Sequence, residues 1–353
     1  MSDAGITIVG SGRYLPGPPV KNSQLERVMD TDDEWIRQRT GIEQRHFAPE
    51  GSGCSDLAYE ASKKAIANAG LQPEDIDYIL FGTMTPDYFF PGSGGLLGAK
   101  LGIPGVPALD IRQQCAAMIY GFQVAQGLLA SGAAKTILLV GAEAHAGFMP
   151  WHDWDLVYSD EDRKLPPHEY DRATRHRGLA VIFGDGAGAL VLRQHEAAGH
   201  GLLGTKVHTD GSKAEQLNIP AGFRQRPYLT HSTLEEELHI PRMKGRDLFK
   251  NAVTKLPRVV RELCAEKEIT LEDIDLFVAH QANDRINNAV RQALKVPVEK
   301  VPSNIARYGN TSGATIPILL DELFQDGTLK PGMLLCFLAL GTGLHWGAAL
   351  MRL

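Results

Sequence analysis

The sequence has no paired cysteines, no long apolar run and no excess of basic charge. Its four cysteines lie far apart, without a C-x-x-C pair, which argues against a disulfide or zinc framework and favours reduced thiols in the cytoplasm. The longest apolar run, Met333 to Leu340, is far too short to cross a bilayer and indicates a buried strand. No basic segment followed by an apolar one opens the chain, so we expect no signal peptide. The net charge of −6 gives no support for nucleic-acid binding, and we expect no membrane contact.

The 353 residues are 43% hydrophobic and 22% charged, an ordinary composition for a globular protein. Apolar strand patterns alternate with helical ones, which predicts an α/β fold with βαβ units and largely parallel sheets. Ile6 to Val9 is expected to form a first strand that is ended by Gly10 and Gly12. Asn22 to Arg39 is expected to form a helix. Thr136 to Val140 is continuously apolar, as is typical of a strand in a sheet covered on both faces. Gly178 to Leu192 is expected to return to strand.

The second half of the chain repeats the order of elements in the first half. Leu271 to Val278 mirrors Pro73 to Leu80, because each combines a Glu-Asp-Ile-Asp turn with an apolar strand. An offset of roughly 195 residues between such pairs indicates an internal duplication. Two halves are therefore expected, residues 1–192 and 193–353.

A single cysteine stands between a strand and a helix. Cys115 follows the apolar stretch Val106 to Ile111 and precedes the helical pattern Ala116 to Ala130. The N–H groups and positive dipole end of that helix are expected to lower the thiol pKa and favour the nucleophilic thiolate. The alternative is an inert cysteine buried in the core.

Two further polar residues are expected at strand ends. His280 follows the strand around Phe277 and precedes the helix Asp284 to Leu294. The duplication offset, added to Cys115, leads to about Asn310 in a glycine-rich loop. Polar groups at the carboxyl ends of parallel strands gather in one site, and a thiol with histidine and amide partners suits acyl transfer.

Several motifs in one order resemble the β-ketoacyl-ACP synthase III family of the thiolase superfamily. They are Thr31 to Ile42, the Cys115 turn, Phe183 to Gly188, His280 to Asn283, Gly309 to Ser312 and Leu340 to Gly347. The resemblance covers nearly the whole chain. It implies a duplicated thiolase-like fold, in which two pseudo-twofold-related halves form a five-layered α-β-α-β-α sandwich. The halves, 1–192 and 193–353, would supply Cys115 and the pair His280 and Asn310 respectively.

The resemblance also implies a reaction without metal or cofactor. Cys115 would take an acyl group from acyl-CoA, and malonyl-ACP would then lose CO2 and attack the acyl-cysteine. His280 and Asn310 would donate hydrogen bonds to the enolate oxygen. Backbone N–H groups of Cys115, Thr342 and Gly343 would stabilise the acyl-transfer oxyanion; Thr342 stands where the family usually has glycine, and positive φ is uncommon for threonine.

Contacts with substrates and partners are implied in the same way. The CoA-binding residues would be Thr31, Trp35, Arg39, Arg177, Arg246 and Asn283. Trp35 and Arg39 would flank the adenine of CoA, and Arg177 would lie near its phosphate end. Asn283 would hold the histidine region or an ordered water. Lys250, Arg285 and Arg291 would bind the acidic ACP, unless they are merely solvated helix faces. The family is homodimeric, with Phe90 entering the partner's acyl pocket and Phe89 helping to shape it.

The stretch Phe148 to Arg177 departs from short family members by an insertion over 148–172. Without clear periodicity, it is expected to be a long loop near the acyl pocket and dimer interface, functional or a surface insertion of no consequence. The insertion keeps a second function open, a specialised-metabolism ketosynthase that joins two β-ketoacyl thioester chains (pyrone or resorcinol type). An acyltransferase or thioesterase without carbon–carbon bond formation, and a non-catalytic binding subunit, are the remaining alternatives.

Overall fold

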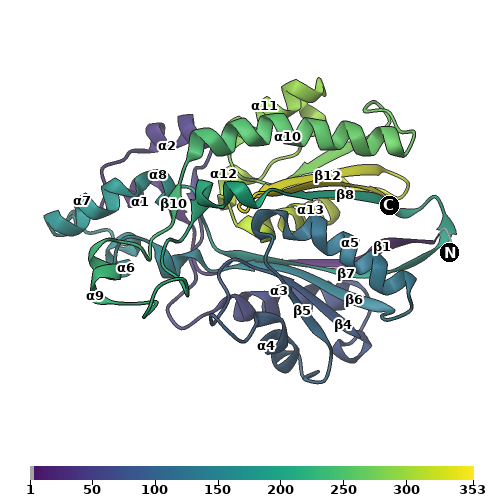
Figure 1. Cartoon of the computed structure of the whole chain (residues 1–353), viewed down its shortest axis with the longest axis horizontal. Helices are drawn as coiled ribbons and strands as arrows, with labels where there is room; N and C mark the ends of the chain where they lie inside the picture. Colours follow the sequence, from purple (N-terminus) through teal and green to yellow (C-terminus); the bar gives the residue numbers. More distant parts are fainter. Residues whose placement is uncertain (1–3) are drawn as a thin grey trace.

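Two mixed β-sheets face each other across a pair of helices in the computed structural model, which describes residues 4–353, with backbone alone at 195–198 (Figure 1). Residues 1–3 lie outside the described part. The prediction that no signal peptide opens the chain falls partly on these residues. The first sheet has the order β1(Ala4–Tyr14), β7(Gly186–Ala198), β6(Thr136–Glu143), β4(Tyr78–Gly82) and β5(Ala108–Ile111). The second has the order β8(Gly201–Thr209), β13(His345–Arg352), β12(Leu334–Gly341) and β11(Leu276–Ala279).

Helices fill three layers around these sheets. α5(Ala117–Ala130) and α13(Thr315–Gln325) lie between the sheets and contact strands of both. α3(Cys54–Asn68) and α4(Ser93–Lys100) cover the outer face of the first sheet, and α10(Gly245–Glu266) with α11(Asp284–Leu294) covers the second. This is the expected five-layered sandwich. Every residue of β6 is buried, which confirms the expectation for Thr136 to Val140.

The two halves share an order of elements. Strands β1, β4, β6 and β7 have counterparts in β8, β11, β12 and β13, which stand in the same spatial order. α5 and α13 follow short 3₁₀ turns, Gln114–Ala116 and Ser312–Ala314, at one constant spacing along the chain. The chain passes from the first sheet to the second between β7 and β8, so the expected boundary at 192/193 falls inside β7.

The expectation of largely parallel sheets is wrong. Within these two sheets, only the pairs β4–β5, β4–β6 and β11–β12 are parallel, and the other four pairs are antiparallel. The reason is local: β12 and β13 are joined by a tight turn that needs no crossover helix, and β7 joins β6 and β1 antiparallel to both.

Three expected elements have different bounds. β1 continues through Gly10 and Gly12, because these glycines let the strand approach α3; a Cβ on Gly10 would lie 2.3 Å from the Ala65 carbonyl oxygen. The expected helix over 22–39 is two helices, α1(Asn22–Leu25) and α2(Asp33–Thr40). The expected strand over 178–192 begins only with β7, after the helix α8(Arg177–Ala180).

The stretch 148–177 is a packed segment and not a long loop. It contains α6(Trp154–Tyr158) and α7(Pro167–Arg175), and Trp151 is 2% exposed. Its apolar side chains pack with those of residues 20–47, and the Gln24 amide donates to the Val157 carbonyl at 2.9 Å. The insertion is therefore joined to α1 and α2, at the left of Figure 1.

Short elements complete the described part of the chain. They are β2(Val20–Lys21), β3(Gln44–Arg45), β9(Leu217–Asn218), β10(Arg242–Met243), α9(His231–Glu235) and α12(Ile305–Tyr308). None of the helices in residues 4–353 combines the length and apolar character needed to cross a membrane.

Candidate active site

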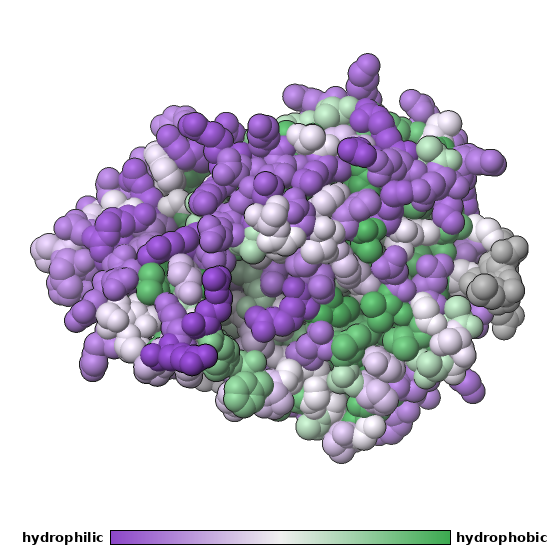
Figure 2. All heavy atoms as spheres, viewed as in Figure 1, coloured by the Kyte–Doolittle hydropathy of each residue, from purple (hydrophilic) through white to green (hydrophobic). Residues whose placement is uncertain are grey.

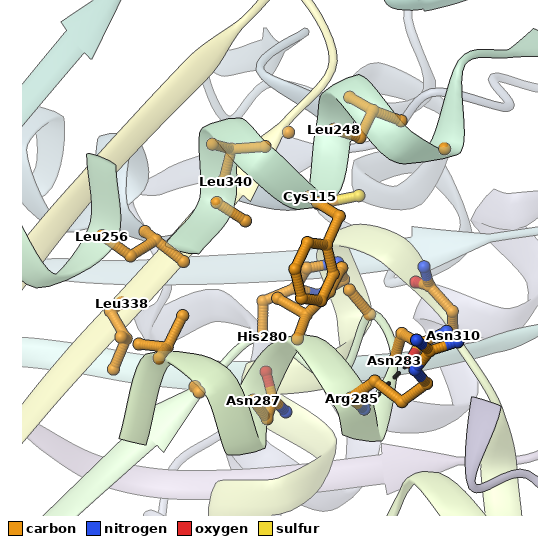
Figure 3. A pocket seen from close by; sticks show the side chains of 18 of the residues that line it. Cys115, Leu248, Leu256, His280, Asn283, Arg285, Asn287, Asn310, Leu338 and Leu340 are labelled. Atoms are coloured by element: carbon orange, nitrogen blue, oxygen red, sulfur yellow. Dashed lines mark hydrogen bonds between the residues drawn. The ribbon is translucent and has the colours of Figure 1, made fainter. Parts of the chain in front are cut away.

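Cys115, His280 and Asn310 line one cavity of about 530 Å³ (Figure 3). All three side chains are buried, at 8%, 5% and 6% exposed. They come from distant parts of the chain: the turn before α5, the residue after β11, and the segment after α12. The duplicated fold therefore brings a thiol, an imidazole and an amide to the wall of a single cavity.

The Cys115 turn is strained and closely packed. Gln114 has φ of 52°, a left-handed conformation uncommon for a residue with a side chain. Gly341, at the end of β12, packs against this turn, since a Cβ there would lie 2.7 Å from the Gln113 oxygen and 3.0 Å from the Cys115 nitrogen. Ser312, in the matching turn of the second half, has φ of 48°. Its Oγ lies 3.4 Å from the Cys115 Sγ.

Burial, and not the helix end, dominates the ionisation of Cys115. Desolvation raises the pKa of its thiol to about 12, against a smaller lowering by the Ser312 hydroxyl. The buried Glu143 carboxylate raises it further. The expectation of a lowered thiol pKa is therefore wrong, because burial of the nucleophile outweighs its position before α5.

His280 is held through one ring nitrogen. Its Nδ1 lies 2.7 Å from the Thr315 Oγ1, and the same hydroxyl can donate to the Ser312 carbonyl at 3.0 Å. Burial lowers the pKa of His280 to about 3, so the ring is neutral near pH 7. The Nε2 atom has no hydrogen-bond partner within residues 4–353 and is left for a ligand in the cavity.

Asn310 presents its amide donor to the cavity. The Ser312 N–H donates to its Oδ1 at 2.8 Å, which turns the Nδ2 end away from the turn. Its backbone pairs with Phe183 in an isolated bridge. Two expectations are corrected here: Asn310 stands at this bridge and not at the end of a strand, and the matching 3₁₀ turns make Gly313 the counterpart of Cys115.

The turn after β12 lies beside the nucleophile. Gly341 and Thr342 line the cavity, and Gly343 does not. Thr342 does not have positive φ, which falls on Gly343 at 140°, so threonine causes no strain here. The Thr342 hydroxyl instead donates to the Leu217 carbonyl.

The residues expected to bind CoA divide into two groups. Arg39, Arg246 and Asn283 line the cavity, whereas Thr31, Trp35 and Arg177 lie outside it. The guanidinium groups of Arg39 and Arg177 stand 4.3 and 4.7 Å from the Trp35 ring centroid, so these three form one cluster.

Asn283 and His280 have separate hydrogen-bond partners within residues 4–353. Asn283 caps α11 by accepting from the Arg285 N–H at 2.9 Å, and its Nδ2 donates to the Arg39 carbonyl at 2.9 Å. It therefore ties α2 to α11 at the rim of the cavity. Thr31 has a buried Oγ1 without a partner among the described residues.

The three expected ACP contacts differ in accessibility. Lys250 and Arg285 are exposed, whereas Arg291 is half-buried and donates to the Val296 carbonyl at 3.3 Å. Arg291 is thus less suited to a protein partner. Lys250 and Arg285 form no salt bridge with any described residue, and the same holds for Arg39 and Arg246.

Phe89 and Phe90 are 67% and 77% exposed. Phe89 lines a second cavity of about 840 Å³, together with Gln114, Phe148 and Thr342. It also contacts Phe223 edge to face, with 5.9 Å between ring centroids. Phe148, at the start of the insertion, reaches this cavity, but the rest of the insertion packs beside α1 and α2.

Sequence reasoning missed three residues of this site. Ser312 and Thr315 stand two and five positions after Asn310, and their spacing in a polar turn before an apolar helix was the available signal. Asn287 lies on the buried face of α11 and lines the cavity. Its position one helical turn after Asn283 was a signal of a shared face.

Comparison with known proteins agrees with this geometry. The family model described as 3-Oxoacyl-[acyl-carrier-protein (ACP)] synthase III C terminal matches residues 264–353, and the 3-Oxoacyl-[acyl-carrier-protein (ACP)] synthase III model matches 109–160 and 169–211. A beta-ketoacyl-[acyl-carrier-protein] synthase III from Caldanaerobacter subterraneus subsp. tengcongensis is 38% identical over 345 residues, 98% of this chain and 97% of that protein.

Solved structures agree as well. The 3-oxoacyl-[acyl-carrier-protein] synthase III of Aquifex aeolicus superposes with a TM-score of 0.84 at 38% identity, covering 99% of this chain and 100% of that one. The priming β-ketosynthase of the R1128 polyketide pathway gives 0.84 at 26% identity, covering 99% and 96%. The chain belongs to the β-ketoacyl-[acyl-carrier-protein] synthase III family.

Proposed function

We propose that this protein is a decarboxylating condensing enzyme that joins an acyl-CoA primer to malonyl-ACP. One observation carries the proposal: Cys115, His280 and Asn310 line the same cavity. A thiol nucleophile beside two neutral hydrogen-bond donors suits a reaction that forms first a thioester and then an enolate.

The chemistry balances without a metal or a redox cofactor. The Cys115 sulfur attacks the acyl-CoA carbonyl, and its proton leaves with the CoA thiol. The malonyl thioester then loses CO2, and the electron pair of the broken carbon–carbon bond stays on the remaining thioester, which becomes an enolate. The enolate carbon attacks the acyl-Cys115 carbonyl, the sulfur leaves as thiolate, and this thiolate takes up a proton.

The residue roles follow from the contacts. Nε2 of His280 and Nδ2 of Asn310 donate to the enolate oxygen; each such donor commonly contributes a few kcal/mol. The backbone N–H groups of Cys115 and Thr342 serve the acyl-transfer oxyanion, which the close packing of Gly341 on the cysteine turn supports. Gly343, which lies outside the cavity, is not assigned this role.

Substrate entry is assigned to the rim. Arg39, Arg246 and Arg285 line the charged mouth and, with Trp35, Arg177 and Thr31 nearby, bind the CoA nucleotide. Lys250 and Arg285 attract the acidic carrier protein. The four cysteines are unpaired, which supports action in the reducing cytoplasm.

A homodimer is supported by the edge of the first sheet. β5 is an edge strand with exposed Ala108 and Leu109, and Figure 2 shows apolar atoms gathered over α5 and the neighbouring edge of this sheet. An exposed apolar edge strand invites pairing with a second copy. Phe90 would then reach the partner's acyl pocket.

The test is purified protein with a set of acyl-CoA primers and malonyl-ACP, with products identified by mass spectrometry. We expect β-ketoacyl-ACP, no acyl-enzyme in Cys115→Ala, and normal acylation without CO2 release in His280→Ala. Absence of product with every primer would reject the proposal, and equal loss of both steps in His280→Ala would reject the division of roles.

The joining of two β-ketoacyl thioester chains is a second candidate. The apolar character of one end of the active-site cavity favours it. Product analysis with two β-ketoacyl thioesters, in the absence of malonyl-ACP, separates it from the first.

A further inference from the structure

The active-site cavity extends beyond the catalytic residues into an apolar space between α10, α11 and the second sheet. We call this space the apolar wing and define it by Ala252, Leu256, Phe277, Val290, Leu294 and Leu338, which all line the cavity and are all buried. Figure 3 shows Leu256 and Leu338 on one side of His280 and Arg285 on the other. The wing therefore lies opposite the charged mouth.

The polar arm of a CoA or carrier-protein thioester needs only the other part of the cavity. That arm runs from the mouth at Arg39, Arg246 and Arg285 to the Cys115 sulfur. Its amide groups would lose hydrogen bonds in the wing, because the six side chains that define the wing are apolar, and each unpaired group would weaken binding. A hydrocarbon chain suits the wing instead.

Two polar side chains of α11 stand beside these apolar walls, Asn287 and Arg291, and the Arg291 guanidinium donates to the Val296 carbonyl. Asn287 is 8% exposed, lines the cavity, and its Nδ2 has no hydrogen-bond partner among the described residues. That atom is enclosed, and a rotation of the Asn287 amide toward the cavity would let a ligand oxygen accept from it, which would remove the cost of an unpaired buried amide. Asn287 stands on α11, one turn after Asn283 (Figure 3). A ligand oxygen that accepts from it would therefore lie between the catalytic residues and the wing.

We propose that the apolar wing binds a linear acyl chain that carries a keto or hydroxyl oxygen where it passes Asn287. The oxygen accepts from Nδ2, and the hydrocarbon continues between α10 and the second sheet. This inference rests on the proposed function, because it takes the chain to be one end of a thioester whose other end reaches Cys115. The chain belongs either to the primer or to the second substrate.

Calorimetry of acyl-CoAs with the Cys115→Ala protein tests the wing without catalysis. We expect affinity to rise by up to about fourfold for each added methylene until the wing is full. Ala252→Leu should abolish most of this rise and leave acetyl-CoA binding unchanged. Ala265→Leu, the same change at an exposed position of α10, should leave the rise intact. Equal affinity for all chain lengths, or a rise unaltered by Ala252→Leu, would overturn the proposal.

The oxygen is tested with Asn287→Leu in the same background. We expect binding of 3-oxoacyl- and 3-hydroxyacyl-CoA to weaken about five- to tenfold, while the saturated acyl-CoA of equal length binds at least as well. Equal losses for all three ligands, or no loss, would contradict a hydrogen bond from Asn287. A thermal unfolding midpoint equal to that of the parent protein serves as the control for folding.

Two arms identify the source of the chain. If wild-type protein acetylated on Cys115 still shows the dependence on chain length, the chain belongs to the second substrate; if a long acyl group on Cys115 blocks the wing, it belongs to the primer. A flat chain-length response with normal condensation would reject the wing and leave the proposed function standing. A rise in affinity with chain length, without any condensation, would support the wing and reject the proposed function.

Discussion

At the scale of single residues, the hydroxyl of Thr315 controls which ring nitrogen of His280 carries the proton. It has one hydrogen and two acceptors within reach, Nδ1 of His280 at 2.7 Å and the Ser312 carbonyl at 3.0 Å. When it donates to Nδ1, the neutral ring carries its proton on Nε2 and can donate to an enolate. When it donates to Ser312, Nε2 becomes an acceptor. Thr315 is therefore a positioning residue for the proposed reaction.

Replacement of Thr315 tests this role. Thr315→Val should slow malonyl-thioester decarboxylation by about 10- to 100-fold, and acylation of Cys115 should stay unchanged. Thr315→Ser keeps the hydroxyl and should restore most of the rate. ¹⁵N NMR of the histidine ring should show loss of the Nε2–H tautomer in the valine variant only. Equal defects in both variants would indicate a packing role.

The raised pKa of Cys115 predicts a simple alkylation profile. Because its pKa is about 12, the thiolate fraction is minute at pH 7 and rises about tenfold for each pH unit up to that value. Iodoacetamide labelling followed by peptide mass spectrometry should therefore accelerate steadily from pH 7 to 10. A plateau near pH 8 would show that the helix end overcomes burial.

At the scale of elements, the close approach of the end of β12 to the cysteine turn positions the nucleophile. Gly341→Ala puts a methyl group 2.7 Å from the Gln113 oxygen, and such overpacking costs about 1–3 kcal/mol. We expect a lower urea midpoint and a slower acylation burst. Gly105→Ala, where a Cβ meets nothing within 4 Å, is the matched control and should change neither. Normal acylation in Gly341→Ala would disprove the positional role.

The elements also separate what the sequence could predict from what it could not. The bounds of α11 and the burial of β6 followed from hydrophobic pattern and helix signals. The antiparallel direction of β7 and β13 could not be predicted, because an apolar run in the sequence does not indicate whether the neighbouring strand is parallel or antiparallel. Gly10 and Gly12 were taken for a strand end, since only the packed α3 reveals their steric reason.

The same limit applies to the candidate site. Cys115, His280 and Asn310 could be named because each stands in a recognisable turn. Thr315 and Asn287 could not, because their importance depends on contacts across the fold. The sign of the Cys115 pKa shift was missed for a similar reason: burial is a property of the packed molecule, whereas the helix start is visible in the sequence.

At the scale of the whole molecule, the exposed edge strand β5 predicts self-association. Leu109, which is 42% exposed, should lie at the interface between two copies. Leu109→Lys would place a charge on this edge and oppose pairing. Sedimentation velocity should find a dimer for the parent chain and a monomer for the variant. Val298→Lys, at a site 63% exposed and remote from the edge, should remain dimeric; a monomeric parent chain would refute the prediction.

The arginine pair over Trp35 gives the protein an optical reporter. Both guanidinium groups lie within 5 Å of the indole centroid, at 4.3 and 4.7 Å, so an adenine ring that stacks on an indole face covered by one of them must displace it. Exchange of a cation for a purine alters the fluorescence emission of tryptophan. Nucleotide arrival can thus be timed in a stopped-flow instrument separately from thioester chemistry, and Trp35→Phe would assign the signal among the four tryptophans of the chain.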